Sequence, residues 1–138
     1  MAANSVFLDT NGWLALLNAS DQLHQRADAA WRDLGSRGYE IVLTYWVVAE
    51  TGNGLARTPV REQFSGIADR ILNDPRCRVI FVTRGLVRRA LDLYRERTDK
   101  QWGLVDCASF LVMADEQIAE AFTTDRHFEQ AGFKAMLL

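Results

Sequence analysis

Short apolar runs alternate along the chain with stretches whose apolar residues recur at helical spacing. The runs are only a few residues long and almost wholly apolar, which is typical of strands buried on both faces of a parallel sheet. They predict strands at residues 6–8, 39–43, 78–82, 121–124 and 134–138.

The segments between these runs carry helix signals. Thr44 and Thr83 stand where N-caps are expected, and Pro59 stands where a helix can begin. Strands that alternate with helices predict an α/β fold, a three-layer α/β/α sandwich around a mainly parallel sheet. The helices are expected at residues 13–18, 22–35, from Thr44 onward, 59–73, 84–97 and from Asp106 onward.

Length and composition restrict the class of protein. The chain has 138 residues, of which 49% are hydrophobic and 25% charged, and we expect a single globular domain over residues 1–138. No apolar run approaches the length of a membrane span, and the first residues lack a basic leader, so no membrane association is expected. Cys77 and Cys107 form no disulfide framework, and we expect a cytoplasmic protein. A net charge of −2 argues against a protein that simply coats nucleic acid.

Acidic residues recur at the ends of the predicted elements. Asp9 and Asp125 each follow an apolar strand directly, at the edge of a parallel sheet where ligands bind. Asp106 begins an amphipathic helix, and Glu50 lies on a largely apolar helix, where a buried charge needs a partner. Carboxylates gathered at one sheet edge suit Mg²⁺ or Mn²⁺, which can bind a substrate phosphate and activate a water molecule.

Each of these acids also has a purely structural explanation. Asp9 and Asp106 can cap helices, and Asp125 can close a turn. Glu50 can face water or pair with Arg57. The metal-site hypothesis therefore rests on the set of four acids and not on any one of them.

Four segments together resemble the PIN-domain family, and within it the VapC-type toxins of bacterial toxin–antitoxin pairs. The resemblance covers essentially the whole chain. It implies a divalent metal, hydrolysis of phosphodiester bonds in RNA, a cognate antitoxin that blocks the site, and assembly as a homodimer. The matching segments are FLDTN at 7–11, VAET at 48–51, GLVDCASF at 103–110 and TTDRHF at 123–128.

The chain departs from the family pattern just before Asp106. Relatives commonly carry hydroxyl side chains where this chain has Gly103 and Val105. We interpret two nearby polar residues as ordinary surface residues: Asp99 as a solvated loop aspartate and His127 as a surface histidine.

Two hypotheses follow. In the first, the protein is a Mg²⁺- or Mn²⁺-dependent endoribonuclease and a toxin, in which Asp9, Asp106 and Asp125 bind the metal while Glu50 binds it too or orients the attacking water. In the second, it is a non-catalytic PIN-like interaction domain that binds RNA or a protein partner, which the missing hydroxyls favour.

Overall fold

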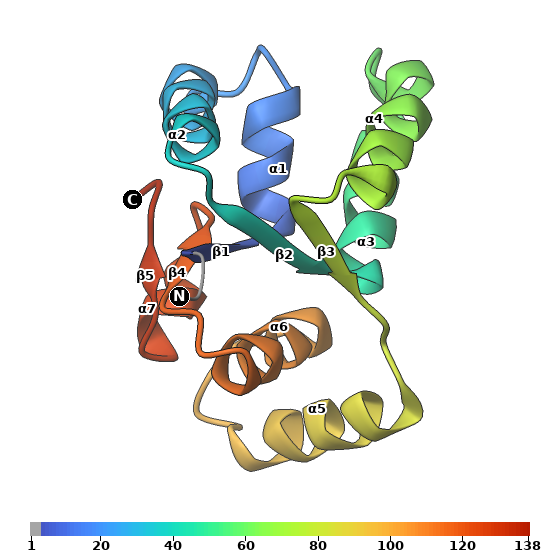
Figure 1. Cartoon of the computed structure of the whole chain (residues 1–138). Coiled ribbons are helices and arrows are strands. Elements are labelled where there is room, and N and C mark those ends of the chain that lie inside the picture. Colours follow the sequence, from blue (N-terminus) through green and yellow to red (C-terminus); the bar gives the residue numbers. More distant parts are fainter. Residues whose placement is uncertain (1–3) are drawn as a thin grey trace.

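The computed structural model describes residues 4–138, and its centre is a five-stranded sheet. All four strand pairings are parallel, and the order across the sheet is β3-β2-β1-β4-β5 (Figure 1). The strands are β1 (Ser5–Leu8), β2 (Glu40–Thr44), β3 (Cys77–Ile80), β4 (Glu120–Phe122) and β5 (Lys134–Ala135).

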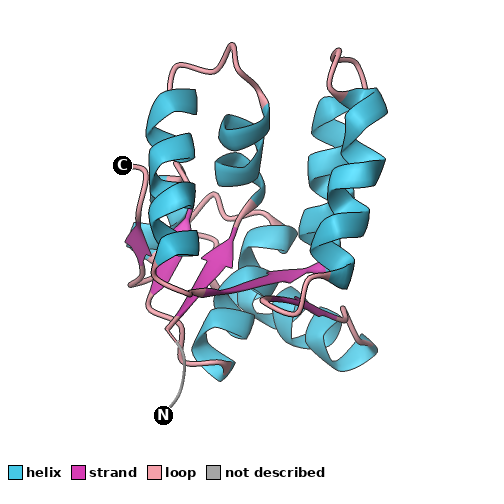
Figure 2. Ribbon diagram, turned by 45° about the horizontal axis from the view of Figure 1, so that its top comes forward, coloured by secondary structure: helices cyan, strands magenta, loops and turns pink. Residues whose placement is uncertain are grey.

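Helices cover both faces of this sheet, as Figures 1 and 2 show. Four helices cover one face: α1 (Thr10–Leu17), α2 (His24–Ser36), α3 (Tyr45–Leu55) and α4 (Arg61–Asn73). The helices α5 (Arg84–Glu96) and α6 (Leu104–Asp115) pack together on the other face, and α7 (Arg126–Gln130) contacts α6. The predicted α/β/α architecture is confirmed. No helix within residues 4–138 is both long and apolar enough to cross a bilayer.

The strand order fixes where a ligand can bind. The chain builds the sheet outward from β1 in one direction through β2 and β3, and in the other through β4 and β5. The carboxyl ends of β1 and β4 therefore meet at a topological switch point, where α/β sheets bind ligands. The register pairs Leu8 with Phe122, so the residues that follow them, Asp9 and Thr123, leave the sheet side by side.

Burial on both faces explains why the strands have no polar alternation. Because helices cover both sides of the sheet, the side chains on either face of a strand lie in the same apolar surroundings. The apolar residues of β1, β2 and β4 with no exposed surface are Val6, Phe7, Leu8, Val42, Leu43, Ala121 and Phe122.

Helix α1 begins earlier than predicted, at Thr10, which places Gly12 inside the helix instead of in a turn before it. A side chain at Gly12 has no room, because a Cβ atom there would lie 2.0 Å from the carbonyl oxygen of Phe122. The glycine thus allows α1 to pass close to the backbone at the end of β4.

Most other element boundaries shift by one or two residues, and three further differences from the prediction concern α6, β5 and α7. Helix α6 begins at Leu104, with Gly103 as its N-cap, so Asp106 lies within the first turn. The fifth strand spans only two residues, and α7, with five residues, was not predicted. Such short elements carry too few residues to show a hydrophobic period.

We expect Gly12→Ala to destabilise the fold by roughly 3 kcal/mol, because the added methyl group forces α1 away from Phe122. Gly35→Ala is the matched control: this exposed position near the end of α2 has nothing within 4 Å of an added Cβ. It should leave stability unchanged or raise it by up to about 1 kcal/mol, because alanine favours the helix. Urea denaturation of both variants measures the difference, and equal midpoints would show that the close approach at Gly12 is unimportant.

Candidate metal centre

Three aspartates reach the carboxyl edge of the sheet from separate elements. Asp9 follows β1 and caps α1, where its Oδ2 accepts a hydrogen bond from the Asn11 N–H at 3.4 Å. Asp125 follows β4 and caps α7, accepting from the His127 N–H at 2.9 Å. Asp106 lies in the first turn of α6. For Asp9 the capping explanation is therefore correct, and it coexists with membership of an acidic cluster. Asp125, expected to close a turn, also caps α7. Asp106, expected as a cap, is the third residue of α6, whose N-cap is Gly103.

Asp9 is the most buried acid, with 2% of its surface exposed. Burial raises the pKa of this carboxyl group from 3.8 to about 7, and the charges of Asp106 and Asp125 act in the same direction. A hydrogen bond from the Thr123 hydroxyl to Asp9 Oδ2, at 2.7 Å, opposes the increase in pKa. At neutral pH, Asp9 is therefore poised between its neutral and its charged form.

The hydroxyl group of Thr123 joins two of the acids. It donates to Asp9 and accepts a hydrogen bond from the Asp125 N–H at 3.0 Å. The sequence pattern predicted no role for Thr123. The available signal was its position, since a threonine at the end of an apolar strand and two residues before an aspartate can hold both neighbouring groups.

Asp106 is held by the backbone at the position where a hydroxyl residue was expected. The N–H of Gly103 donates to Asp106 Oδ2 at 3.2 Å. Burial raises the pKa of Asp106, while the Gly103 hydrogen bond and the neighbouring His127 oppose that increase.

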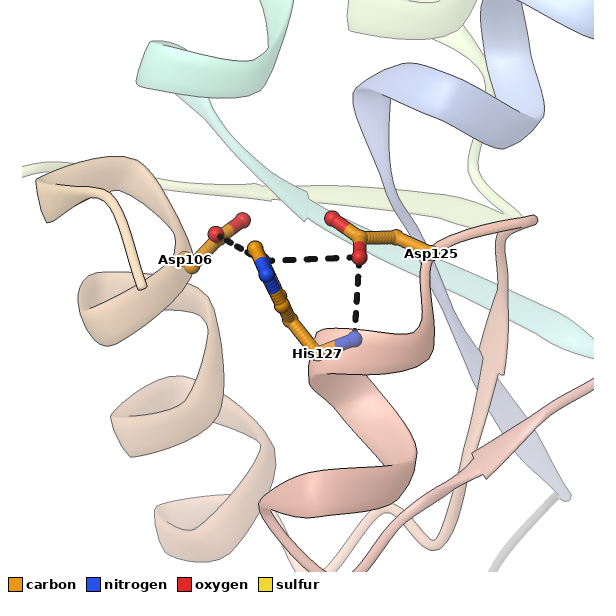
Figure 3. Close-up of side chains that lie close together, drawn as sticks. All are labelled: Asp106, Asp125 and His127. Carbon is orange, nitrogen blue, oxygen red and sulfur yellow. Dashed lines mark hydrogen bonds and ion pairs between the residues drawn. The ribbon is translucent and has the colours of Figure 1, made fainter. Parts of the chain in front are cut away.

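His127 lies between two carboxylates, so its interpretation as a surface histidine was wrong. Its Nδ1 atom is 3.2 Å from Asp106 Oδ2 and 3.4 Å from Asp125 Oδ1, and 28% of its side chain is exposed. Figure 3 shows the imidazole, carried by α7, pointing into the space between α6 and the loop after β4. The Nδ2 atom of Asn11 donates a hydrogen bond to the other carboxylate oxygen of Asp125, Oδ2, at 3.4 Å.

Glu50 stands apart from this cluster. It lies on α3 with an exposed side chain, so of the explanations that the sequence left open the water-facing one is correct and the buried charge is not. It lines a shallow surface pocket together with Asn53 of α3 and with Leu104 and Val105 at the start of α6. Within residues 4–138 the structure shows no hydrogen bond or ion pair of Glu50, but the pocket extends to the turn that carries Asp106.

Asp99 lies in the loop before α6 and is not in the cluster. Its carboxylate pairs with Arg97 at 3.0 Å, and 60% of the side chain is exposed. It is therefore a solvated loop residue, in agreement with the interpretation of the sequence.

The clustered side chains fit a divalent cation. Asp106, Asp125 and His127 can each offer one ligand atom such that all three lie within 4.8 Å of one another. The negative charge of Asp9 lies close enough to the other two aspartates to be felt electrostatically. Carboxylates crowded in this way repel each other, and a bound cation relieves both the repulsion and the cost of burying Asp9.

Comparison with known proteins agrees with this architecture. The PIN domain family matches residues 6–134. The 23S rRNA-specific endonuclease VapC20 of Mycobacterium tuberculosis is 31% identical over 129 residues, which cover 93% of this chain and 95% of that protein.

Two solved structures have the same fold. The crystal structure of M. tuberculosis VapC20, described as a sarcin-ricin loop cleaving toxin, superimposes with a TM-score of 0.82 and 30% identity, covering 93% of this chain and 95% of its own. The structure of FitAcB from Neisseria gonorrhoeae superimposes with a TM-score of 0.62 over 94% of each chain. At 19% identity, the second likeness supports the fold alone.

The raised pKa of Asp9 predicts how stability depends on pH in metal-free buffer. An acid whose pKa is higher in the folded state holds its proton there while the unfolded chain releases it, so stability falls as pH rises between the two pKa values. With a folded pKa of about 7, Asp9 should lower the free energy of unfolding by roughly 2 kcal/mol between pH 5.5 and pH 8. Asp9→Asn should lack this contribution and be more stable than the parent at pH 8.

Urea denaturation in EDTA at both pH values measures this difference. Asp99→Asn is the control, because that exposed carboxylate has a lowered pKa and does not titrate between pH 5.5 and 8. The free energy of unfolding of Asp99→Asn should change with pH as that of the parent does. A parent and an Asp9→Asn variant with parallel pH profiles would show that Asp9 does not titrate in this range.

Proposed function

This chain belongs to the PIN-domain family, and we propose that it is a divalent-metal-dependent endoribonuclease acting as the toxin of a toxin–antitoxin pair. The observation that carries the proposal is the convergence of three aspartates, one of them buried, at the carboxyl edge of the sheet. The similarity to an RNA-cutting relative along 93% of the chain supports the same activity.

Asp9, Asp106 and Asp125 are the residues that would hold the cation, which we propose to be Mg²⁺ or Mn²⁺. A bound cation supplies a site for the scissile phosphate, a water molecule of lowered pKa and stabilisation of the leaving oxygen. The protein positions the aspartates before substrate arrives: Thr123 holds Asp9, and the Gly103 N–H holds Asp106. Such preorganisation lowers the barrier because little rearrangement is needed during the reaction.

For Glu50 we propose that it orients the attacking water and does not bind the metal directly. Its exposed carboxylate lines the pocket beside the first turn of α6, outside the set of close contacts among the aspartates. A carboxylate that shares a pocket with the first turn of α6 can accept a proton or a hydrogen bond from a water molecule that faces the phosphate.

The partners we propose are an RNA substrate, a cognate antitoxin and a second copy of the chain. An rRNA substrate is supported by the 31% identical relative, a 23S rRNA-specific endonuclease. Association of two copies is supported by the exposed aromatic pair Tyr45 and Phe81, whose rings stack at 5.0 Å while 37% and 72% of the residues remain exposed. Exposed apolar surface of this kind is typical of protein interfaces. We place this activity in the cytoplasm, in keeping with two free cysteines.

The second candidate, a non-catalytic interaction domain, is favoured by the absence of hydroxyl side chains at Gly103 and Val105. It predicts binding of RNA or protein without cleavage. An assay of antitoxin-free protein therefore separates the two functions.

Asp106→Asn should abolish most RNA cleavage while preserving the fold. The amide keeps the shape of the side chain and can still accept the Gly103 hydrogen bond, but a neutral group binds a hard cation far less well. We expect the cleavage rate of 23S rRNA with Mn²⁺ to fall by about a hundredfold or more, and the melting temperature without metal to stay near that of the parent. Asp99→Asn, outside the cluster, should cut like the parent. EDTA should stop cleavage by the parent, and added Mn²⁺ should restore it.

If the purified, antitoxin-free parent cuts neither 23S rRNA nor a total RNA pool with Mg²⁺ or Mn²⁺, the proposal that the protein is a nuclease is wrong. The interaction domain would then be the better description.

Glu50→Gln should separate water orientation from metal binding in the same assay. If Glu50 orients the water, its loss should slow cleavage by about a hundredfold, while the rise in melting temperature on adding Mn²⁺ stays as large as in the parent. Asp106→Asn should lose both the cleavage activity and the metal-induced rise in melting temperature. If Glu50→Gln does not show the rise in melting temperature on adding Mn²⁺, Glu50 is a metal ligand. If the variant cleaves RNA as fast as the parent, Glu50 has no role in the reaction.

A further inference from the structure

His127 meets the acidic cluster through a nitrogen atom that is spaced like a metal ligand. Nδ1 lies 3.2 Å from Asp106 Oδ2 and 3.4 Å from Asp125 Oδ1. In an octahedral site with metal–ligand distances of roughly 2.1–2.2 Å, neighbouring ligand atoms are about 3 Å apart. The three candidate ligand atoms of Asp106, Asp125 and His127 lie within 4.8 Å of one another, so a modest shift of these side chains lets one cation contact all three.

The backbone of His127 is fixed from both sides, which limits where its ring can go. The N–H of His127 donates to Asp125, the N-cap of α7. The next residue, Phe128, is fully buried and packs its ring edge-on against Phe110 of α6, with the ring centres 5.0 Å apart. The imidazole is thereby directed into the cluster, as Figure 3 shows.

We propose that His127 Nδ1 is a metal ligand and that it makes the centre prefer Mn²⁺ to Mg²⁺. This inference rests on the proposed function only in that Asp106 and Asp125 hold a cation. Mg²⁺ binds oxygen and keeps much of its water shell, whereas imidazole nitrogen is a favourable ligand for transition metals. A site with one nitrogen among its carboxylates therefore discriminates between two cations that an all-oxygen site would accept alike.

A different role for His127 makes a different prediction. As a protonated counter-cation, the imidazole would compensate the charge of Asp106 and Asp125, and any divalent cation would have to displace it. Its removal would then change the affinities for Mn²⁺ and Mg²⁺ by the same factor. As a ligand, it contributes to Mn²⁺ binding selectively.

The test compares the affinities of the full chain for Mn²⁺ and Mg²⁺ by calorimetry. His127→Asn places an amide oxygen where Nδ1 was, so the ligand changes from nitrogen to oxygen at nearly the same point. We expect Mn²⁺ binding to weaken at least about tenfold relative to Mg²⁺ binding. The control is His24→Asn: His24 is the only other histidine, and its Nδ1 contacts the carbonyl oxygen of Ala15. This variant should keep the parent's ratio.

A spectroscopic measurement reports the ligand directly. Pulsed electron paramagnetic resonance of bound Mn²⁺ should detect coupling to a histidine nitrogen in the parent and in His24→Asn, and none in His127→Asn. Retained Mg²⁺ binding and an unchanged metal-free melting temperature show that His127→Asn is folded.

Equal changes in the affinities for the two cations, without nitrogen coupling in the parent, would overturn the inference and leave the three-aspartate centre intact. A parent that binds neither cation would overturn the inference and the metal dependence of the proposed function together.

Discussion

The carboxyl group of Asp9 is buried at the junction of β1 and β4, and the site is organised around it. Removing a charge from water is costly, and here it is offset by a short hydrogen bond from the Thr123 hydroxyl and a longer one from the Asn11 N–H. A cation nearby favours the charged form of this carboxylate. The burial of Asp9 therefore lowers the stability of the metal-free fold and at the same time strengthens the interaction with a cation.

Helix capping and metal binding use the same side chains. Asp9 and Asp125 each accept a hydrogen bond from the first turn of the following helix, which leaves further oxygen lone pairs free to face the cluster. The positive ends of α1 and α7 meanwhile favour negative charge at these positions. The structural explanation of each acid is therefore part of how the site is built, because a cap fixes the direction in which the remaining lone pairs point.

The sequence was sufficient to predict the features set by local pattern. The apolar strands, the caps at Thr44 and Thr83, and the position of Asp9 and Asp125 at strand ends all follow from the order of residues along the chain. The features that it could not predict depend on contacts between distant segments. Gly12 is required by the carbonyl of Phe122, and the exposure of Glu50 depends on how α3 is rotated over the sheet. His127 acquires its neighbours only when α7 packs against α6.

The missing hydroxyls before Asp106 have a similar explanation. A hydroxyl at position 103 would be one way to hold the Asp106 carboxylate, but the backbone N–H of Gly103 already donates to it. The hydroxyl that supports the cluster comes instead from Thr123, directly after β4. Polar support is thus divided between a helix N-terminus and a strand end, and no aspartate of the cluster depends on a side chain at position 103 or 105. The hydrogen bonds that hold the cluster therefore do not require the hydroxyls that the family pattern places before Asp106.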